Sequence, residues 1–365
     1  MSERTIVLAA GGTGGHLFPA QALAEVLVAR GLRTVLATDH RVESYGADFP
    51  AAETHVIPSA TLAGRSPVAM AKTGVTLASG VRQAHALLGR IKPAVVVGFG
   101  GYPSFPPLVA AAMRRIPTAL HEQNAVLGRA NAMLAKRVTR VATSFPDVAG
   151  TEALPDGRVL LTGNPVRSRV LAAAATPYAP HDAAGKFRLV VFGGSQGARY
   201  FSETMPDAIA ALPADLRARL SLIQQCRPED LGAVTARYDA LGVDADCAPF
   251  FDDLPRLIAD SQLVVARSGA STVAELCVLG RPSILVPLPH ALDNDQLRNA
   301  RTLVDAGAAA SYPQSDLTPD VLANVIAQLL STPDRLSSAA AAAAALGRPD
   351  AAERLADCVE ALADR

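Results

Sequence analysis

The chain has 365 residues, half of them hydrophobic and only 19% charged, which is ample for globular cores and predicts about two domains. Aromatic residues make up 4% and Trp is absent, so the apolar mass is Ala, Val and Leu, which favours helices packed on parallel strands over an all-β sandwich. The formal net charge of zero divides into 16 Lys/Arg against 10 Asp/Glu over residues 1–166 and 18 against 24 over the rest. A basic half followed by an acidic half suggests that the two halves have different partners.

Two further classes are excluded by what the sequence lacks. The four cysteines are scattered, without CxxC or Cys/His spacing, so neither a metal site nor a disulfide framework is expected and a reducing cytoplasm is the natural compartment. No apolar run approaches the ~20 residues that cross a bilayer, and glycines interrupt the N-terminal run. We expect a soluble protein that can still rest on a membrane surface.

Apolar runs rich in β-branched residues alternate with helical stretches through the first half. Such runs are typical of buried parallel strands. They cover residues 6–10, 94–97, 116–120, 138–142 and 159–161. A helix is predicted after the first run, with Pro19 in its first turn, Leu23 and Leu27 on one face, and Gly31 at its end.

The second half repeats this organisation. Its predicted strands cover residues 189–192, 220–223, 263–266 and 283–286. The first of them leads through a glycine-rich turn into a helix with Phe201, Met205, Ile209 and Leu212 at helical spacing. The alanine-rich residues 337–346 predict a surface helix, and residues 351–363 a last helix.

The two halves open alike, at residues 8–15 and 191–197, as though one element were used twice. We therefore predict an α/β protein of two doubly wound Rossmann-like domains that face an interdomain cleft. The first covers residues 1–166 and the second residues 167–349, joined near Pro165. The helix at about 350–365 is expected to pack back on the first domain.

Glycine and polar clusters follow the predicted strands, where ligands of open α/β sheets bind. In the first half they cover residues 11–16, 98–102 and 121–124, and in the second residues 193–196, 250–253, 267–272 and 289–296. Glycine-rich turns before helices bind anions, so a phosphorylated ligand is predicted, although each turn could serve only to tighten strand-to-helix packing. Leu17 occupies the third glycine position of a GxGxxG pattern and no GK[ST] is present, which argues against NAD and against ATP hydrolysis.

Six motifs together resemble the MurG family of glycosyltransferases, in order and spacing, from about residue 5 to residue 310. They are residues 11–16, 100–102, 121–124, 163–167, 193–198 and 267–275. The resemblance implies the glycosyltransferase-B fold and an enzyme on the cytoplasmic face of the bacterial inner membrane. It further implies transfer of N-acetylglucosamine from UDP-N-acetylglucosamine to undecaprenyl-diphosphate-linked muramoyl pentapeptide, in peptidoglycan synthesis. Other cell-wall synthesis proteins would then be candidate partners.

The resemblance places the donor mainly on the second domain. Phe251 would present backbone groups to uracil with Arg167 nearby, Glu275 would accept hydrogen bonds from the ribose, and Gln296 and Asn124 would read the sugar hydroxyls. The full donor set implied is Thr13, Gly14, Gly15, Asn124, Arg167, Ser195, Phe251, Ala270, Ser271, Thr272, Val273, Ala274, Glu275 and Gln296. Asp295 departs from part of the family, which has Gln there, so one sugar contact is in doubt.

His16 is the predicted catalytic base. The ordinary histidine pKa near 6.5 suits a group that takes a proton from an acceptor hydroxyl. That hydroxyl would displace UDP in line, which inverts the α-linkage of the donor. The alternative is that His16 orients a phosphate or caps its helix. Tyr102, His121 and Glu122 are the acceptor candidates, with packing or loop structure as the alternative for each.

No metal and no cofactor beyond the sugar nucleotide are predicted. Two DxD triplets occur, and each could suggest a metal. Residues 244–246 are interpreted as a solvated turn, and residues 293–295 lie near the predicted sugar site but are not expected to bind a metal.

A helix over residues 77–91 is the candidate contact with an anionic membrane. Its apolar face is Leu77, Val81, Ala84, Leu88 and Ile91. Basic residues of the same domain surround it in the sequence, namely Lys72, Arg82, Arg90, Lys92, Arg114, Arg115, Lys136 and Arg137. An ordinary core-facing helix explains the pattern equally well, and the absence of stacking aromatics and of a basic helix argues against nucleic acid.

Two other functions remain open at this point. One is a related enzyme of the same fold, a glycolipid synthase or a UDP-sugar epimerase, which would be expected to differ at residues 121–124. The other is a catalytically silent sugar-nucleotide-binding protein, against which the presence of His16 with Asn124, Glu275 and Gln296 speaks.

Overall fold

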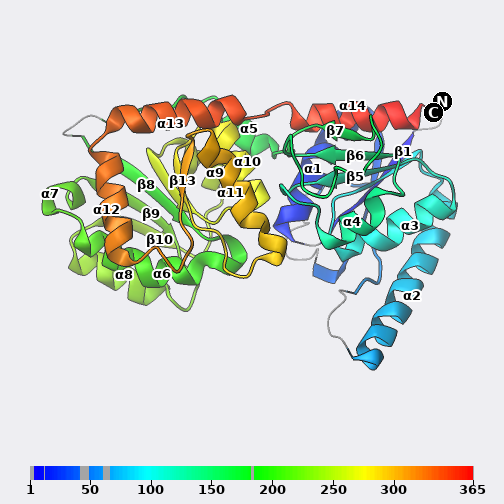
Figure 1. Ribbon diagram of the computed structural model, residues 1–365, viewed down its shortest axis with the longest axis horizontal. Coiled ribbons are helices and arrows are strands. Elements are labelled where there is room, and N and C mark those ends of the chain that lie inside the picture. Colours follow the sequence, from blue (N-terminus) through cyan, green and yellow to red (C-terminus); the bar gives the residue numbers. More distant parts are fainter. Residues whose placement is uncertain (1–3, 12, 42–48, 61–65, 182–184, 365) are drawn as a thin grey trace. The chain divides into compact units, whose positions relative to one another are not determined.

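The computed structural model describes residues 4–11, 13–41, 49–60, 66–181 and 185–364 (Figure 1). The chain divides into two compact units, Met1–Arg167 with Pro349–Arg365, and Ser168–Arg348. The boundary predicted from the sequence lies within one residue of this division at each crossing. Each unit is an α/β domain with its own parallel sheet and its own core, and each is described by itself.

The first unit is built on a seven-stranded sheet in the order β3-β2-β1-β4-β5-β6-β7, with every pair parallel. The strands are β1 (Thr5–Ala9), β2 (Arg33–Thr38), β3 (Glu53–Val56), β4 (Val95–Gly98), β5 (Thr118–Glu122), β6 (Arg140–Thr143) and β7 (Val159–Leu161). The helical elements are α1 (Gly14–Ala29), α2 (Pro67–Ile91), η2 (Tyr102–Ser104), α3 (Phe105–Met113), α4 (Arg129–Ala135) and α14 (Ala351–Ala363). The strand order reverses between β1 and β4, which is where ligands of doubly wound sheets bind.

The C-terminal helix α14 completes the core of this unit. Leu355, Val359 and Leu362 are buried in one cluster with side chains of α1, β1 and β4, and Figure 1 shows α14 beside α1. Arg30, the residue that ends α1, pairs with Asp357 at 2.7 Å and with Glu360. A segment from the far end of the sequence thus supplies part of the first unit's hydrophobic interior.

The second unit has a six-stranded parallel sheet in the order β10-β9-β8-β11-β12-β13. The strands are β8 (Phe187–Phe192), β9 (Leu220–Gln225), β10 (Asp244–Ala248), β11 (Leu263–Ala266), β12 (Ser283–Leu285) and β13 (Ala309–Ser311). The helical elements are α5 (Ser168–Ala173), α6 (Gly194–Ala211), α7 (Ala214–Arg217), α8 (Leu231–Ala240), α9 (Leu254–Ala259), α10 (Ala270–Leu279), η3 (Leu292–Asn294), α11 (Asp295–Asp305), α12 (Pro319–Leu330) and α13 (Pro333–Leu346). Two Rossmann-like domains are therefore confirmed.

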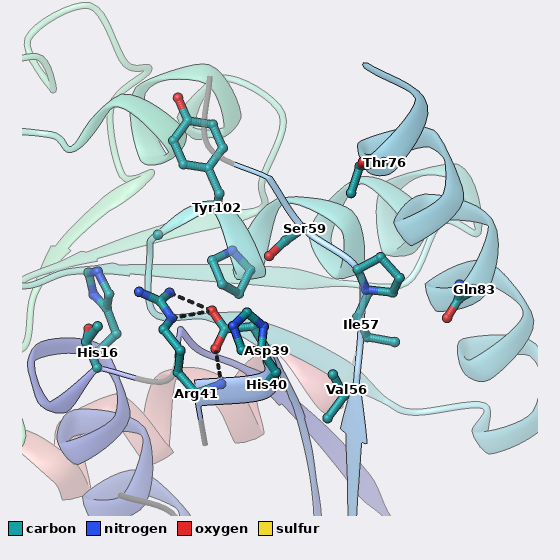
Figure 2. A pocket seen from close by; sticks show the side chains of 14 residues that line it. His16, Asp39, His40, Arg41, Val56, Ile57, Ser59, Thr76, Gln83 and Tyr102 are labelled. Atoms are coloured by element: carbon teal, nitrogen blue, oxygen red, sulfur yellow. Dashed lines mark hydrogen bonds and ion pairs between the residues drawn. The ribbon is translucent and has the colours of Figure 1, made fainter. Parts of the chain in front are cut away.

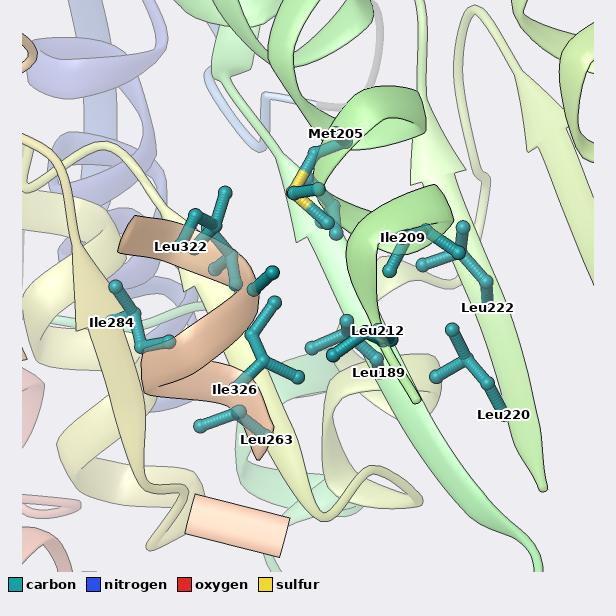
Figure 3. Packing of buried hydrophobic residues seen from close by; sticks show 14 of the residues in the cluster. Leu189, Met205, Ile209, Leu212, Leu220, Leu222, Leu263, Ile284, Leu322 and Ile326 are labelled. Carbon is teal, nitrogen blue, oxygen red and sulfur yellow. The ribbon is translucent and has the colours of Figure 1, made fainter. Parts of the chain in front are cut away.

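Helices α6 and α12 cover one face of this second sheet. Figure 3 shows their apolar side chains packed together with those of β8, β9, β11 and β12. Met205 and Ile209 of α6 are fully buried, as is Phe201, which confirms the helical spacing read from the sequence. Burial of each such side chain contributes about 1.5–3 kcal/mol.

Two local expectations were wrong. Residues 244–246 form the start of β10, an edge strand whose partly exposed side chains lack the apolar pattern of a central strand, rather than a turn. Pro19 lies inside α1 and not in its first turn, because Thr13 is already the N-cap and the helix begins at Gly14. The proline ring withholds one hydrogen bond from the carbonyl of Gly15, four residues before it.

The apolar face of α2 packs on its own domain. Ala84 and Leu88 are buried and Leu77, Val81 and Ile91 are half-buried, and the helix packs along α3. The core-facing alternative is thus the correct one for this face. Within the described part of the chain, no helix has the length and hydropathy required to cross a bilayer.

Candidate active site

A cavity of about 620 Å³ opens at the carboxyl ends of β1 to β4 in the first unit (Figure 2). Its wall combines the start of α1, the residues that follow β2, β3 and β4, and one side of α2. The lining residues are Thr13, His16, Asp39, His40, Arg41, Val56, Ile57, Pro58, Ser59, Thr76, Gln83, Gly101, Tyr102 and Pro103. The predicted base His16 and the predicted acceptor residue Tyr102 therefore share one cavity.

His16 stands in the first turn of α1, against the glycine loop that follows β4. A Cβ added at Gly100 or at Gly101 would come within 3.3 Å of its ring, and both glycines have positive φ values of 89° and 69°. Only glycine combines this backbone with such a close approach. The His16 Nδ1 atom lies 3.1 Å from Oε1 of Gln123.

Burial lowers the pKa of His16 below its usual value, and the nearby Arg41 cation lowers it further. The hydrogen bond with Gln123, the carbonyl of Phe99 and the Asp39 carboxylate act in the opposite direction. The net shift keeps the imidazole neutral at neutral pH, which is the state a general base requires.

Arg41 and Asp39 also line the cavity, and neither was predicted from the sequence. The Arg41 guanidinium donates to Oδ2 of Asp39 from Nε at 3.0 Å and from Nη2 at 2.5 Å, and the Arg41 backbone N–H donates to Oδ1 at 3.0 Å. Asp39 is 7% exposed and Arg41 49%, so a buried carboxylate holds an accessible cation at the cavity wall (Figure 2). The available signal was their place at the carboxyl end of β2, a strand that was not predicted.

His121 and Glu122 are buried at the end of β5, with exposures of 0% and 1%. The Glu122 carboxylate accepts hydrogen bonds from the backbone of Asn124 and Gly128 and from the side chains of Asn124 and Asn131. Burial raises the pKa of Glu122, and these four bonds oppose the rise. In this structure both side chains organise the loop after β5, and their direct contact with an acceptor stays a prediction.

In the second unit, the start of α10 is a candidate anion site. Gly269 caps the helix without a side-chain hydrogen bond, and the hydroxyl of Ser271 is buried and has no partner among the described residues. The helix contains the predicted residues Ala270, Ser271, Thr272, Val273, Ala274 and Glu275. Free N–H groups at a helix start favour negative charge.

Gln296 lies at the start of α11, held by two neighbouring loops. Its side-chain Oε1 accepts from the backbone N–H of Leu288 at 2.9 Å, and its carbonyl accepts from the hydroxyl of Ser268 at 2.8 Å. Asp295 accepts from the Gln296 N–H at 2.6 Å, and burial raises the pKa of Asp295. These bonds position Gln296, and no described residue accepts a hydrogen bond from its amide nitrogen.

The other predicted donor residues are distributed over both units. Phe251 is half-buried in the loop between β10 and α9, and Ser195 is in the first turn of α6, although its side chain lies outside the described part. The guanidinium carbon of Arg167 lies 3.9 Å from the ring centroid of Phe18 on α1. Thr13, Gly14 and Gly15 begin α1, and Asn124 is tied to Glu122. Their convergence on one ligand in an interdomain cleft stays a prediction.

Metal-binding side chains do not cluster in the regions that the structure describes. No group of three or more His, Cys, Asp or Glu side chains there could hold a metal ion.

Comparisons with known proteins identify the family. Residues 6–143 match the glycosyltransferase family 28 N-terminal domain, and residues 188–355 match its C-terminal domain. The UDP-N-acetylglucosamine--N-acetylmuramyl-(pentapeptide) pyrophosphoryl-undecaprenol N-acetylglucosamine transferase of Chelativorans sp. (strain BNC1) is 54% identical over 364 residues, covering 100% of this chain and 96% of that protein. The chain belongs to the MurG family.

Other members agree with this assignment. The transferase of the same name from Methylobacterium nodulans is 57% identical over 361 residues, which cover 98% of this chain and 97% of that protein. The crystal structure of MurG from Acinetobacter baumannii has a TM-score of 0.79 and 27% identity, and covers 98% of this chain and 99% of that one. The fold is therefore the two-domain glycosyltransferase-B fold of the MurG family, as the sequence resemblance implied.

Proposed function

We propose that the protein transfers N-acetylglucosamine from UDP-N-acetylglucosamine to the C4 hydroxyl of undecaprenyl-diphosphate-linked N-acetylmuramoyl pentapeptide, converting lipid I to lipid II in peptidoglycan synthesis. The observation that carries the proposal is the similarity to transferases of this name, which spans the whole chain at 54% identity. The placement of the His16 imidazole in a large cavity of the N-terminal domain supports it.

The mechanism is a single in-line displacement with inversion. His16 removes the proton of the C4 hydroxyl while its oxygen attacks the anomeric carbon, and UDP leaves from the opposite face. Since burial lowers the pKa of His16, the base is ready at neutral pH. A positioned general base contributes roughly 10²–10⁴-fold to the rate.

The second unit would receive the donor. The departing diphosphate gathers negative charge. The N–H groups at the start of α10 and the buried hydroxyl of Ser271, which has no partner among the described residues, are suited to neutralise this charge. Uracil would bind the backbone of Phe251, with Arg167 nearby. The ribose would bind the carboxylate of Glu275, and the sugar would bind the amide of Gln296. Ser195 would lie at the diphosphate. This scheme requires no cofactor besides the two substrates.

The first unit would receive the acceptor in the 620 Å³ cavity. Its sugar would lie at His16, within reach of Tyr102, and its diphosphate at the Arg41 guanidinium. The carboxylate of Asp39 already fixes that guanidinium, so little side-chain entropy is lost on binding.

We place the enzyme at the cytoplasmic face of the inner membrane, where its acceptor is anchored. Met70 and Val75 of α2 are 58% and 71% exposed and flank the exposed Lys72, and Met113 of α3 is 63% exposed and is followed by Arg114 and Arg115. Exposed apolar side chains beside cations suit an anionic leaflet, where each cation contributes about 1 kcal/mol. Contacts with other cell-wall synthesis proteins would be made from this location.

The test is transfer of radiolabel from UDP-N-acetylglucosamine to a lipid-linked muramoyl acceptor. The wild type should transfer label with inversion, and His16→Ala should lose about 10²–10⁴-fold in kcat while still binding UDP. His55→Ala, a histidine of β3 that bonds to Glu53 and does not line the cavity, is the matched control.

Two outcomes would contradict the proposal. An inactive wild type that still binds UDP-N-acetylglucosamine would indicate a silent binding protein, and epimerised sugar nucleotide formed without lipid would indicate an epimerase. Near-full activity of His16→Ala would remove His16 as the base.

A further inference from the structure

A line of hydrogen bonds joins His16 to a backbone carbonyl across the first unit. His121 Nε2 lies 2.9 Å from the carbonyl oxygen of Gly163. The side-chain nitrogen of Gln123 lies 3.0 Å from His121 Nδ1 and 3.1 Å from the carbonyl oxygen of His121. Gln123 Oε1 lies 3.1 Å from His16 Nδ1. Gln123 and His121 are 1% and 0% exposed, so water does not compete for these groups.

The donor and acceptor of each bond can be assigned in order, starting from the Gly163 carbonyl. A carbonyl oxygen can only accept, so His121 carries its hydrogen on Nε2. Burial lowers the pKa of His121 to about 4, so at neutral pH its Nδ1 has no hydrogen and can only accept. Gln123 therefore donates from its amide nitrogen to His121 Nδ1 and to the His121 carbonyl. The oxygen and nitrogen of a Gln side chain cannot be told apart by shape, so they are assigned from their hydrogen-bond partners. Here two acceptors face one end of the amide, and that end must therefore be the nitrogen.

The oxygen of the Gln123 amide determines which nitrogen of His16 carries the hydrogen. Gln123 Oε1 can only accept, so the hydrogen of neutral His16 is on Nδ1 and the lone pair is on Nε2. That Nε2 edge faces the glycine loop at the cavity, since a Cβ on Gly101 would lie 3.4 Å from it. We propose that Gln123, oriented by His121 and the Gly163 carbonyl, is a positioning residue that fixes His16 in the tautomer with a basic Nε2. The catalytic part of this inference rests on the proposed function, whereas the tautomer of His16 does not depend on that function.

The surroundings of His16 carry few other charges. Arg41 and Asp39 face it from the end of β2 as an ion pair, and their effects on its pKa oppose each other. The carbonyl of Phe99 favours the protonated form, and the Asn131 amide and the His16 ring both approach the Cβ position of Gly100. His121 contacts the Phe99 ring, with centroids 5.6 Å apart. Among the described residues, the Gln123 amide is the side chain that forms a hydrogen bond with His16 Nδ1.

The kinetic test compares two replacements of Gln123. Gln123→Met keeps the length of the side chain but offers no acceptor, so kcat should fall about 10²-fold, within the range of general-base effects, with the KM for UDP-N-acetylglucosamine unchanged within threefold. Gln123→Glu keeps an acceptor for Nδ1–H, and its protonated carboxyl also keeps a donor that faces the two acceptors on His121. With this buried carboxyl protonated, kcat should stay within tenfold of wild type, and ionisation of the carboxyl would raise the pKa of His16 and move the acid limb of kcat/KM to higher pH. A purely structural role would not couple this rescue to the pH profile.

The spectroscopic test needs no acceptor substrate. In ¹⁵N-histidine NMR of the full chain, His16, assigned with His16→Ala, should show a protonated Nδ1 and an unprotonated Nε2 at pH 7.5, and Gln123→Met should lose this single tautomer. A wild-type His16 with hydrogen on Nε2 would overturn the inference, as would the same tautomer in both Gln123 variants with unchanged kcat. If the tautomer is found and the wild type transfers no sugar, the proposed function fails and the positioning role of Gln123 survives.

Discussion

At the scale of single residues, the charge beside His16 is set by one arginine and one aspartate. Arg41 Nε and Nη2 bond to Asp39, and no described residue accepts a bond from Nη1. A Cβ at Gly11 would lie 3.5 Å from the His16 ring and 3.7 Å from Arg41 Nη2, so both side chains face the same loop. The Arg41 guanidinium can therefore act on an anionic ligand and on His16, the proposed base, together.

Replacement of Arg41 by Ala should weaken binding of the lipid acceptor and leave binding of the donor unchanged. A charge-assisted hydrogen bond to a phosphate contributes about 1.5–3 kcal/mol, so the KM for the lipid acceptor should rise roughly 10–100-fold. Since the cation lowers the pKa of His16 and Asp39 raises it, the acid limb of kcat/KM should also move to higher pH. Steady-state kinetics from pH 5 to 9 measures both.

Arg237→Ala is the control, because that arginine pairs with Asp207 in the second unit. An Arg41→Ala enzyme with unchanged acceptor KM would show that the diphosphate binds elsewhere. A changed KM for UDP-N-acetylglucosamine alone would assign Arg41 to the donor.

At the scale of elements, the loop after β5 depends on one buried carboxylate. Glu122 accepts from Gly128 at 2.9 Å and from Asn131 at 2.7 Å, besides two bonds from Asn124. All four partners are donors, so an ionised carboxylate satisfies them and an amide cannot. The loop that carries Gln123 and Asn124 is thus built around charge.

The change Glu122→Gln should lower the free energy of unfolding by about 1–3 kcal/mol, because its NH₂ group would face donors. Urea unfolding at pH 7.5 measures the loss, with Glu203→Gln on the surface of α6 as control. Equal stability of Glu122→Gln and wild type would mean that Glu122 is protonated at this pH and already donates one bond.

Most central strands were predictable from the sequence, with the exception of β2, whereas β7 was the one edge strand that was predicted. Runs such as Leu189–Phe192 and Leu263–Ala266 are apolar on both faces because helices cover both sides of a central strand. The strands β3, β10 and β13 lie at sheet edges or are three to five residues long, with half-exposed side chains. Their register comes from the neighbouring strand, which no local pattern reveals.

The candidate site was also predictable from the sequence only in part. His16 lies in a motif that the sequence displays, but its hydrogen-bond partner is 107 residues away. Arg41 follows a strand that was not predicted, and the burial that lowers the pKa of His121 to about 4 exists only after folding. Local motifs therefore indicated the proposed base, whereas the groups that we propose to set its tautomer and charge required the tertiary structure.

At the scale of the whole molecule, the chain leaves the first unit at residue 167 and returns to it at residue 349. The returning helix α14 buries Leu355, Ala356 and Val359 completely in the first core. The second unit has a separate core that contains Leu322 and Ile326. A cavity made in α14 should thus destabilise a domain whose other residues are almost 200 positions away in sequence.

Leu355→Ala removes a fully buried side chain and should cost about 2–5 kcal/mol of the first unit's stability. Hydrogen-exchange mass spectrometry should then show faster exchange in β1, β2, β4 and α1, with the strands of the second unit unchanged. Leu322→Ala on α12, equally buried, should give the reverse pattern, with faster exchange in β8, β9 and β11. Because each core is closed by its own helices, a single substitution that loosened both sheets to the same extent would show that the two units unfold as one cooperative structure.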